Sequence, residues 1–392
     1  MDAQAPAPRP AEGTHDYGEL ALVLTGGGAR GAYQVGLLRG IAKRVPELRI
    51  PIIAGVSAGA INAVHLANHH GTFAQAAEEL AGMWNELTPD RIFRVDTRSL
   101  VRNMGRWGLQ LAGAGARETR VRGLVDTTPL WELLTEALHP VDGELTGVEA
   151  NLRDGTLKAL ALGTTSYTTG QSVVWVQGRE IETWERPQRR SVPTRIRVEH
   201  VMASAALPLF FPAVRIGTHW YGDGGIRLTA PLSPALHLGA HKILAISTRY
   251  ERTLQEADTP VVAGYPPPAQ VLGVLYNAIF LDLIDQDAAR MQLVNSVLAK
   301  LPPERRHPLR IVELLVLRPS RDLAVIAGEY EPRLPRGFRL LTRGLGTRET
   351  ASPDVLSLLM FQDDYSKRLL AIGEEDAERR WDEIAAFLNG GK

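Results

Sequence analysis

The chain has 392 residues, of which 44% are hydrophobic and 22% charged, a composition typical of a globular protein with a large core. Lys and Arg together number 44, as do Asp and Glu, so no overall field favours nucleic acid as a partner. Cysteine is absent, which excludes thiol nucleophiles, thiolate metal sites and disulfides, and which fits a cytoplasmic location.

The N-terminal residues 1–17 are rich in Ala and Pro and have no cationic start followed by an apolar run. We therefore expect a flexible leader rather than a signal peptide. No uninterrupted apolar stretch approaches the roughly 18 residues of a membrane span. These features favour a cytoplasmic protein that is soluble or peripheral at a membrane.

Two units of strand, turn and helix open the chain. Residues 19–25, "ELALVLT", are typical of a buried strand and are followed by a helical pattern over 29–45. Residues 49–57, "RIPIIAGVS", predict a second strand that runs directly into a helix over 58–70.

The remaining chain is predicted to form helices and loops that make a cap (72–140), a hairpin around Thr169–Gly170 (156–178), strands (241–250 and 310–319) and helices (271–300 and 352–388). The last helix would begin with Ser352 as its N-cap and Pro353 as its first residue.

Three glycines of "GGGARG", residues 26–31, lie between the first strand and the first helix. Gly26, Gly28 and Gly31 match the G-x-G-x-x-G spacing of a dinucleotide-binding turn. Backbone N–H groups left free at such a turn suit a pyrophosphate, and they equally suit the oxyanion of an acyl-transfer reaction. The turn alone leaves both kinds of site open.

The sequence "GVSAG", residues 55–59, places Ser57 in a G-x-S-x-G motif where the second strand becomes a helix. In that context the motif forms a strained elbow that presents the serine hydroxyl, although a plain glycine turn with a helix-capping serine is the alternative. A dinucleotide fold would need an acidic residue at the end of the second strand, but Glu47 lies before that strand and Ser57 occupies its end. The two motifs together favour acyl transfer, with the glycines holding an oxyanion.

A serine nucleophile needs a base, and the sequence "WYGDGGIRLTAP" places Asp223 in a turn flanked by glycines. The alternative interpretation of this segment is an ordinary Asp-Gly hairpin turn. An Asp with a pKa near 3.9 is a weak base at neutral pH, so the site must disfavour free solvation of its charge. His237 and His241 would give the Ser, Asp, His order of a triad, and His65 and His219 are further candidates. We interpret His237 and His241 as structural or surface residues.

Together these motifs resemble the patatin-like phospholipase family. The resemblance rests on "GGGARG" at 26–31, "GVSAG" at 55–59, "ASAALPLFFPAV" at 203–214 and "DGGIRLTAPL" at 223–232, and covers roughly residues 20–245. It implies a three-layer α/β fold whose mostly parallel central sheet is flanked by helices. It also implies a Ser-Asp dyad of Ser57 as nucleophile and Asp223 as base, with an oxyanion hole formed by the backbone amides around Gly26, Gly27 and Gly28.

The resemblance implies supporting roles for other motif residues, namely Arg30, Gly31, Gly55, Gly59, Gly224 and Gly225. Family members often carry Asn six residues after the aspartate, where this chain has Thr229. Residues 18–250 would form the catalytic domain, and residues 251–392 would add strands and helices that complete it.

The implied function is that of a serine esterase of the phospholipase A type, a lipid acyl hydrolase that acts through an acyl-Ser57 intermediate. Its substrates would be phospholipids or related lipids, and it would need no metal or organic cofactor. An acyltransferase and a catalytically silent module that binds lipid or protein are the alternatives on the same fold. A nucleotide-dependent oxidoreductase is a further alternative, which the motifs favour less than these two.

Residues 91–125 contain eight arginines against Asp96 and Glu118, an imbalance that the neutral total conceals. Within this stretch, residues 98–111 form an amphipathic pattern with one apolar face that includes Trp107. Such a helix either packs on the protein's own core or lies on an anionic membrane. An enzyme that extracts a lipid must reach the membrane, which favours the second interpretation, peripheral membrane contact through residues 98–111.

Overall fold

The computed structural model describes residues 19–94, 123–280, 283–334, 339, 346–350 and 353–390. The expected leader over 1–17, the amphipathic stretch over 98–111 and the expected N-cap Ser352 lie outside these ranges. The described strands are β1 (Leu20–Leu24), β2 (Ile52–Val56), β3 (Ala159–Ser166), β4 (Ser172–Gly178), β5 (Glu185–Arg186), β6 (Arg189–Pro193), β7 (Val214–Ile216), β8 (His219–Asp223), β9 (Lys242–Ile246) and β10 (Glu313–Leu317).

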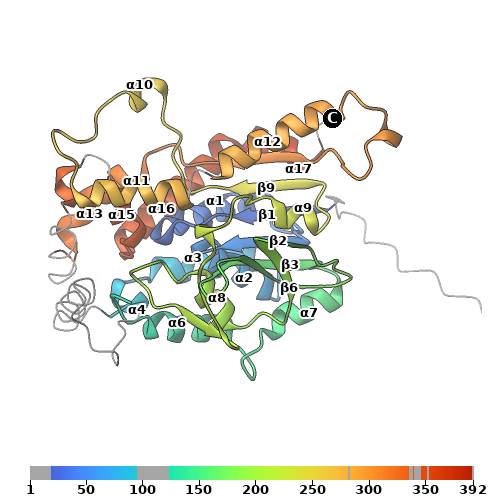
Figure 1. Cartoon of the computed structure of the whole chain (residues 1–392), viewed down its shortest axis with the longest axis horizontal. Helices are drawn as coiled ribbons and strands as arrows, with labels where there is room; N and C mark the ends of the chain where they lie inside the picture. Colours follow the sequence, from blue (N-terminus) through green and yellow to red (C-terminus); the bar gives the residue numbers. More distant parts are fainter. Residues whose placement is uncertain are drawn as a thin grey trace, which may run out of the picture.

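These strands form one sheet in the order β10-β9-β1-β2-β3-β4-β6-β5, and β8 pairs with both β3 and β7. Strands β10, β9, β1, β2 and β3 run parallel, whereas β4 and β8 pair with β3 in the antiparallel direction. Figure 1 shows β9, β1, β2 and β3 following one another through the middle of the molecule. The mostly parallel central sheet predicted from the sequence is confirmed.

Helices cover both faces of the sheet, as the residues on the two faces of β1 show. Leu20, Leu22 and Leu24 belong to a core shared with α1, α2 and α3, whereas Ala21 and Val23 belong to a second core shared with α9 and α12. Apolar residues on both faces are what a buried parallel strand requires. The described helices are α1 (Gly31–Arg44), α2 (Ala58–Asn68), α3 (Phe73–Asn85), α4 (Pro89–Ile92), α6 (Thr128–Leu138), α7 (Thr146–Asp154), α8 (Val198–Ser204), α9 (Ser233–His237), α10 (Leu254–Ala257), α11 (Pro268–Phe280), α12 (Leu283–Leu298), α13 (Leu323–Tyr330), α15 (Asp354–Leu359), α16 (Asp363–Arg379) and α17 (Trp381–Leu388).

The parallel strands bring the sequence motifs to one edge of the sheet. β1 ends just before the Gly-rich turn, and β2 ends just before Ser57, with Leu24 opposite Gly55 in the register. Because the carboxyl ends of neighbouring parallel strands share an edge, the turn and the serine lie side by side. The pairing of β3 with β8 places Thr164 opposite Asp223, which brings the aspartate to the same region.

The predicted hairpin over 156–178 is present as β3 and β4, and Gly170 in its turn has a φ of +71°. The predicted helix over 352–388 is wrong in its continuity, because three helices, α15, α16 and α17, replace it. Phe361 between α15 and α16 packs edge-on against Phe93, with ring centroids 6.3 Å apart. This tertiary contact overrides the local helical pattern, which the apolar spacing alone cannot reveal.

One stretch of the described chain, Pro268–Leu298, is long and apolar enough to cross a membrane when judged by length and composition. Its most apolar window has a mean hydropathy of 1.2, and 31% of that window is buried. The stretch includes α11 and α12, and Ile284, Ala288 and Met291 of α12 pack into the core on one face of the sheet. In this structure α12 therefore acts as a covering helix of the sheet.

Candidate active site

Ser57 occupies a strained elbow between β2 and α2. Its φ is +57° and its ψ −131°, a combination that a residue other than glycine adopts only when its surroundings enforce it. A Cβ on Gly55 would lie 2.4 Å from the carbonyl oxygen of Gly59, and a Cβ on Gly59 would lie 2.3 Å from that of Leu24. Larger residues at either position would collide with backbone, so the elbow depends on both glycines.

Ser204 of α8 fixes this elbow from outside the motif. Its Oγ accepts a hydrogen bond from the Ser57 N–H at 3.0 Å and donates one to the Gly163 carbonyl of β3 at 2.7 Å. Ser204 is fully buried, so its loss would remove a hydrogen bond from two backbone groups that lie away from water. Ser204 lies in the segment 203–214 that carries part of the resemblance, but sequence reasoning gave it no role.

Asp223 ends β8 and precedes the 3₁₀ turn Gly224–Ile226. Its N–H donates to the Ala206 carbonyl at 3.1 Å, and its own carbonyl accepts from the Thr165 hydroxyl at 2.8 Å. The N–H of Gly225 donates to the carboxylate Oδ1 at 2.9 Å. Backbone and side chain of Asp223 are therefore both held in place.

Aromatic side chains shield Asp223, which is fully buried. A Cβ on Gly222 would lie 2.2 Å from the Tyr167 hydroxyl, and a Cβ on Gly225 would lie 2.2 Å from the Phe280 ring, so these two glycines let the aromatic side chains approach closely. Phe280 stacks on Tyr276, also of α11, with centroids 5.4 Å apart. Helix α11 thus covers the aspartate with two rings.

This burial raises the pKa of Asp223 to about 7, because desolvation penalises the charged carboxylate. Hydrogen bonding from Ser57 and Gly225 lowers the pKa, but less strongly. The Ser57 hydroxyl lies beside the carboxylate without completing a hydrogen bond of ordinary geometry, so Oδ2 has no partner among the described residues. Hydrogen bonds in active sites often shorten only when substrate binds.

The Gly-rich turn presents N–H groups beside the serine. A Cβ on Gly26 would lie 3.0 Å from the Ser57 Cβ and 3.6 Å from its Oγ. Neither the N–H of Gly27 nor that of Gly28 donates a hydrogen bond to another described residue. Thr248, just after β9, supports the turn by donating from its hydroxyl to the Gly26 carbonyl at 2.7 Å. Free N–H donors close to a serine hydroxyl suit a developing oxyanion.

The other motif residues pack around the same region. A Cβ on Gly31 would lie 2.8 Å from the Trp84 ring, and one on Gly224 would lie 2.3 Å from the Gly163 carbonyl oxygen. The buried guanidinium of Arg30 forms an ion pair with a carboxylate of α15. These glycines therefore serve close packing, and the arginine serves an internal contact.

An apolar cavity of about 40 Å³ opens at Ser57. Its walls come from several helices and include Met83, Trp84, Ile92, Leu133, Leu207 and Leu358. Part of the segment 72–140, expected to form a cap, therefore lines this cavity. A larger cavity of about 860 Å³ beside β10 is lined by many charged side chains and contains neither Ser57 nor Asp223. The smaller cavity is the one whose lining suits a hydrocarbon chain.

The histidines considered from the sequence lie elsewhere. His237 stacks on Trp184, with centroids 4.5 Å apart and planes 7° apart, and His241 is exposed. Burial lowers the pKa of His65 to about 4, so that it is neutral at physiological pH. His219 lies on β8, and among the described residues no histidine is hydrogen-bonded to the serine or the aspartate of the site.

Thr229, where the chain departs from the family pattern, is exposed, and its N–H bonds the Arg227 carbonyl at 2.9 Å. In the part of the chain that the structure describes, its side chain forms no hydrogen bond to Asp223. Within the same ranges, no group of three or more His, Asp or Glu side chains is arranged to hold a metal ion.

The sequence model described as patatin-like phospholipase matches residues 22–236, more than half of the chain. The chain belongs to the patatin-like phospholipase family. The resemblance drawn from the four motifs is therefore confirmed, and membership of the family supports a lipid hydrolase activity. The matched range includes the Gly-rich turn, Ser57 and Asp223 of this patatin-like protein. A comparison with curated protein sequences found no match.

Several solved structures are similar to this patatin-like protein. Human GIVD cytosolic phospholipase A2, in complex with methyl gamma-linolenyl fluorophosphonate, is 15% identical with a TM-score of 0.44, over 96% of this chain and 60% of that one. VipD from Legionella pneumophila is 14% identical with a TM-score of 0.30, over 90% and 66%. The ExoU-SpcU complex of the Pseudomonas aeruginosa type III secretion system is 16% identical with a TM-score of 0.27, over 94% and 76%. The chain thus spans about three fifths of the human enzyme, and at these identities and TM-scores no function transfers.

Proposed function

We propose that this patatin-like protein hydrolyses carboxylic esters of lipids through an acyl-Ser57 intermediate. The proposal is carried by the meeting of three groups: the strained Ser57, the buried Asp223 with a pKa near 7, and the free N–H groups of Gly27 and Gly28. Each group alone has structural explanations. Their convergence beside an apolar cavity supports acyl chemistry.

In the proposed acylation, Asp223 accepts the Ser57 proton while Oγ attacks the carbonyl carbon of the ester. Negative charge develops on the carbonyl oxygen, and the N–H groups of the turn at Gly26, Gly27 and Gly28 stabilise it. The carbon–oxygen bond to the leaving alcohol then breaks, and the alcohol takes the proton from Asp223. Water, deprotonated by the same carboxylate, then attacks the acyl carbon, the bond from that carbon to Ser57 Oγ breaks, and Oγ takes the proton back from Asp223 as the free acid leaves.

The cavity beside Ser57 supports a lipid rather than a short polar ester. Its walls are formed mainly by aliphatic and aromatic side chains of α3, α4, α6 and α15. Burying the first methylene groups of an acyl chain there gains about 0.8 kcal/mol for each group removed from water. A volume of about 40 Å³ has room for roughly one or two such groups, so we infer that the start of the acyl chain, next to the ester carbonyl, binds here.

The test is hydrolysis of a mixed phospholipid and neutral lipid extract, with products followed by mass spectrometry. Wild-type protein should release free fatty acids, whereas Ser57→Ala and Asp223→Asn should each lose nearly all activity. Adding an acceptor alcohol separates hydrolysis from acyl transfer, since a transferase would produce the new ester in preference to the acid. Undiminished release of fatty acids by Ser57→Ala would refute the proposal.

A further inference from the structure

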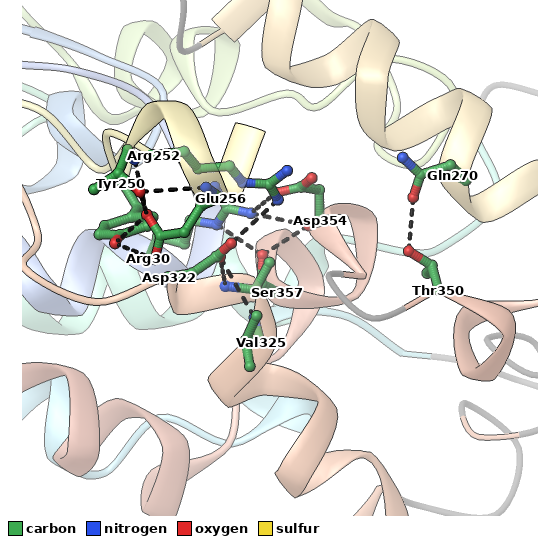
Figure 2. Close-up of polar contacts among 12 residues, drawn as sticks. Arg30, Tyr250, Arg252, Glu256, Gln270, Asp322, Val325, Thr350, Asp354 and Ser357 are labelled. Carbon is green, nitrogen blue, oxygen red and sulfur yellow. Dashed lines mark hydrogen bonds and ion pairs between the residues drawn. The ribbon is translucent and has the colours of Figure 1, made fainter. Parts of the chain in front are cut away.

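The side chain of Arg30 ties the Gly-rich turn to α15 (Figure 2). Its Nε donates to the Ser357 Oγ at 2.7 Å, and its Nη2 donates to the Asp354 Oδ1 at 2.6 Å. The Ser357 hydroxyl in turn donates to the Asp354 carbonyl at 2.7 Å. The side chains of Arg30 and Asp354 are 4% and 14% exposed, so the ion pair is shielded from solvent.

Helix α15 also contacts the turn through its backbone. A Cβ on Gly28 would lie 2.1 Å from the carbonyl oxygen of Leu358, so the helix sits directly on this glycine. Leu358 and Leu359 line the apolar cavity together with Gly28 and Ser57. Figure 1 shows α15 beside α11 and α13 at one end of the molecule, and both helices contact it. One short helix therefore supports the turn and forms a wall of the cavity.

The Arg30 guanidinium is committed to this internal contact. An arginine that binds a substrate carboxylate or phosphate presents its donors in a free fork. Here Nε and Nη2 are engaged by α15, and the Asp354 carboxylate balances the charge. Removing one partner of such a buried pair leaves an uncompensated charge, which is strongly unfavourable. The pair therefore holds the turn firmly in one position.

We propose that Asp354 and Ser357 are positioning residues for the ester hydrolysis proposed above, on which this inference rests. By holding Arg30, they keep the N–H groups of Gly27 and Gly28 aimed at the place where the oxyanion forms. Such donors act within a narrow range of about 2.7–3.1 Å, so a small shift of the turn lowers turnover. Both residues lie beyond 22–236, so a C-terminal helix outside the family match completes the site.

The experiment measures kcat and KM for a short, soluble p-nitrophenyl ester, which makes little use of the cavity wall. Asp354→Ala should lower kcat by about 100-fold, as expected for a misplaced oxyanion donor, with KM within about three-fold of wild type. Ser357→Ala removes one hydrogen bond only and should lower kcat less. The double variant that combines Arg30→Ala and Asp354→Ala should lower kcat no more than the more damaging of the two single variants, because both changes break the same ion pair.

Asp376→Ala is the matched control for stability. Asp376 is a buried carboxylate of α16 that accepts hydrogen bonds from the Tyr33 hydroxyl at 3.1 Å and the Ser320 N–H at 2.9 Å. Its loss should lower the melting temperature, yet the folded fraction should keep kcat near wild type. If Asp354 had only a structural role, the folded fraction of Asp354→Ala would keep kcat near wild type, as Asp376→Ala should.

Amide hydrogen exchange over the Gly-rich turn, residues 25–30, gives a readout that does not need activity and leaves out Tyr33, the partner of Asp376. Exchange there should rise in Asp354→Ala and Ser357→Ala but not in Asp376→Ala. If wild type hydrolyses the ester through Ser57 while Asp354→Ala and Ser357→Ala both keep kcat within two-fold, the inference is wrong and the proposed function stands. If wild type hydrolyses neither this ester nor the lipid extract, the proposed function fails, and unchanged exchange over 25–30 in both variants would overturn the positioning role as well.

Discussion

The Ser204 hydroxyl lies 3.0 Å from the backbone nitrogen of Ser57 and holds the strained elbow against β3. Replacing Ser204 with Ala should lower kcat about ten-fold and destabilise the fold by about 1–3 kcal/mol, because two buried polar groups lose their partner. Ester kinetics and thermal unfolding measure the two effects.

Ser191→Ala is the control, because the Ser191 hydroxyl accepts from the Trp184 N–H at 2.8 Å and donates to its carbonyl at 3.3 Å, a similar bridge without contact to the elbow. It should lose stability and keep kcat. Wild-type kcat in Ser204→Ala would show that the elbow does not need this bond.

The burial of Asp223 should make folding stability depend on pH. Its pKa is about 7 in the folded protein and near 3.8 when unfolded, so between these values the folded state holds a proton that the unfolded state has released. Stability from this group therefore falls as pH rises from about 4 to 7. Asp223→Asn should be more stable than wild type above pH 7, by an amount on the order of a few kcal/mol, and inactive.

Urea unfolding of both proteins at pH 5 and pH 8 tests this expectation. The advantage of Asp223→Asn should be small at pH 5 and large at pH 8. An equal difference at both values, or a variant that is less stable at pH 8, would mean that the carboxylate is not desolvated.

The pH dependence of activity should report the same carboxylate. Because the base must be ionised, kcat/KM should rise with pH and level off with an apparent pKa near 7. A histidine base would give a similar curve, so His237→Ala and His241→Ala are the needed variants. Both should keep the profile and the rate near wild type. A loss of about 1,000-fold in either, at unchanged melting temperature, would favour a triad instead.

Residues 98–111, outside the described ranges, are proposed to make peripheral membrane contact. Each Arg near an anionic surface adds about 1 kcal/mol of attraction, which salt screens. Changing Arg98, Arg102 and Arg106 to Gln should weaken co-sedimentation with anionic vesicles at low salt but not with neutral vesicles. Normal binding by this variant, together with a lowered melting temperature of Trp107→Ala, would instead indicate that the stretch packs on the protein's own core.

The sequence predicts the local parts of the site well. The glycines around Ser57 and Asp223 lie within a few residues of the groups that they accommodate, so short motifs contain their whole geometry. The two buried strands before the turn and the elbow are likewise local patterns, and the structure contains both as β1 and β2.

The supports of the site are different in kind. Arg30 and Asp354 are separated by 324 residues, and Ser57 and Ser204 by 147, so no short motif contains both members of either pair. A serine or aspartate in an amphipathic helix has no local pattern that distinguishes an anchor from a surface residue. For the same reason, the sequence does not reveal that Tyr276 and Phe280 cover Asp223.

Labelling with a fluorophosphonate probe, followed by peptide mass spectrometry, tests most directly whether Ser57 is a nucleophile activated by Asp223. We expect one adduct on Ser57 in the wild type, none in Ser57→Ala, and labelling slowed by at least about 100-fold in Asp223→Asn at neutral pH. An adduct on another residue, or labelling of Asp223→Asn at the wild-type rate, would contradict this expectation.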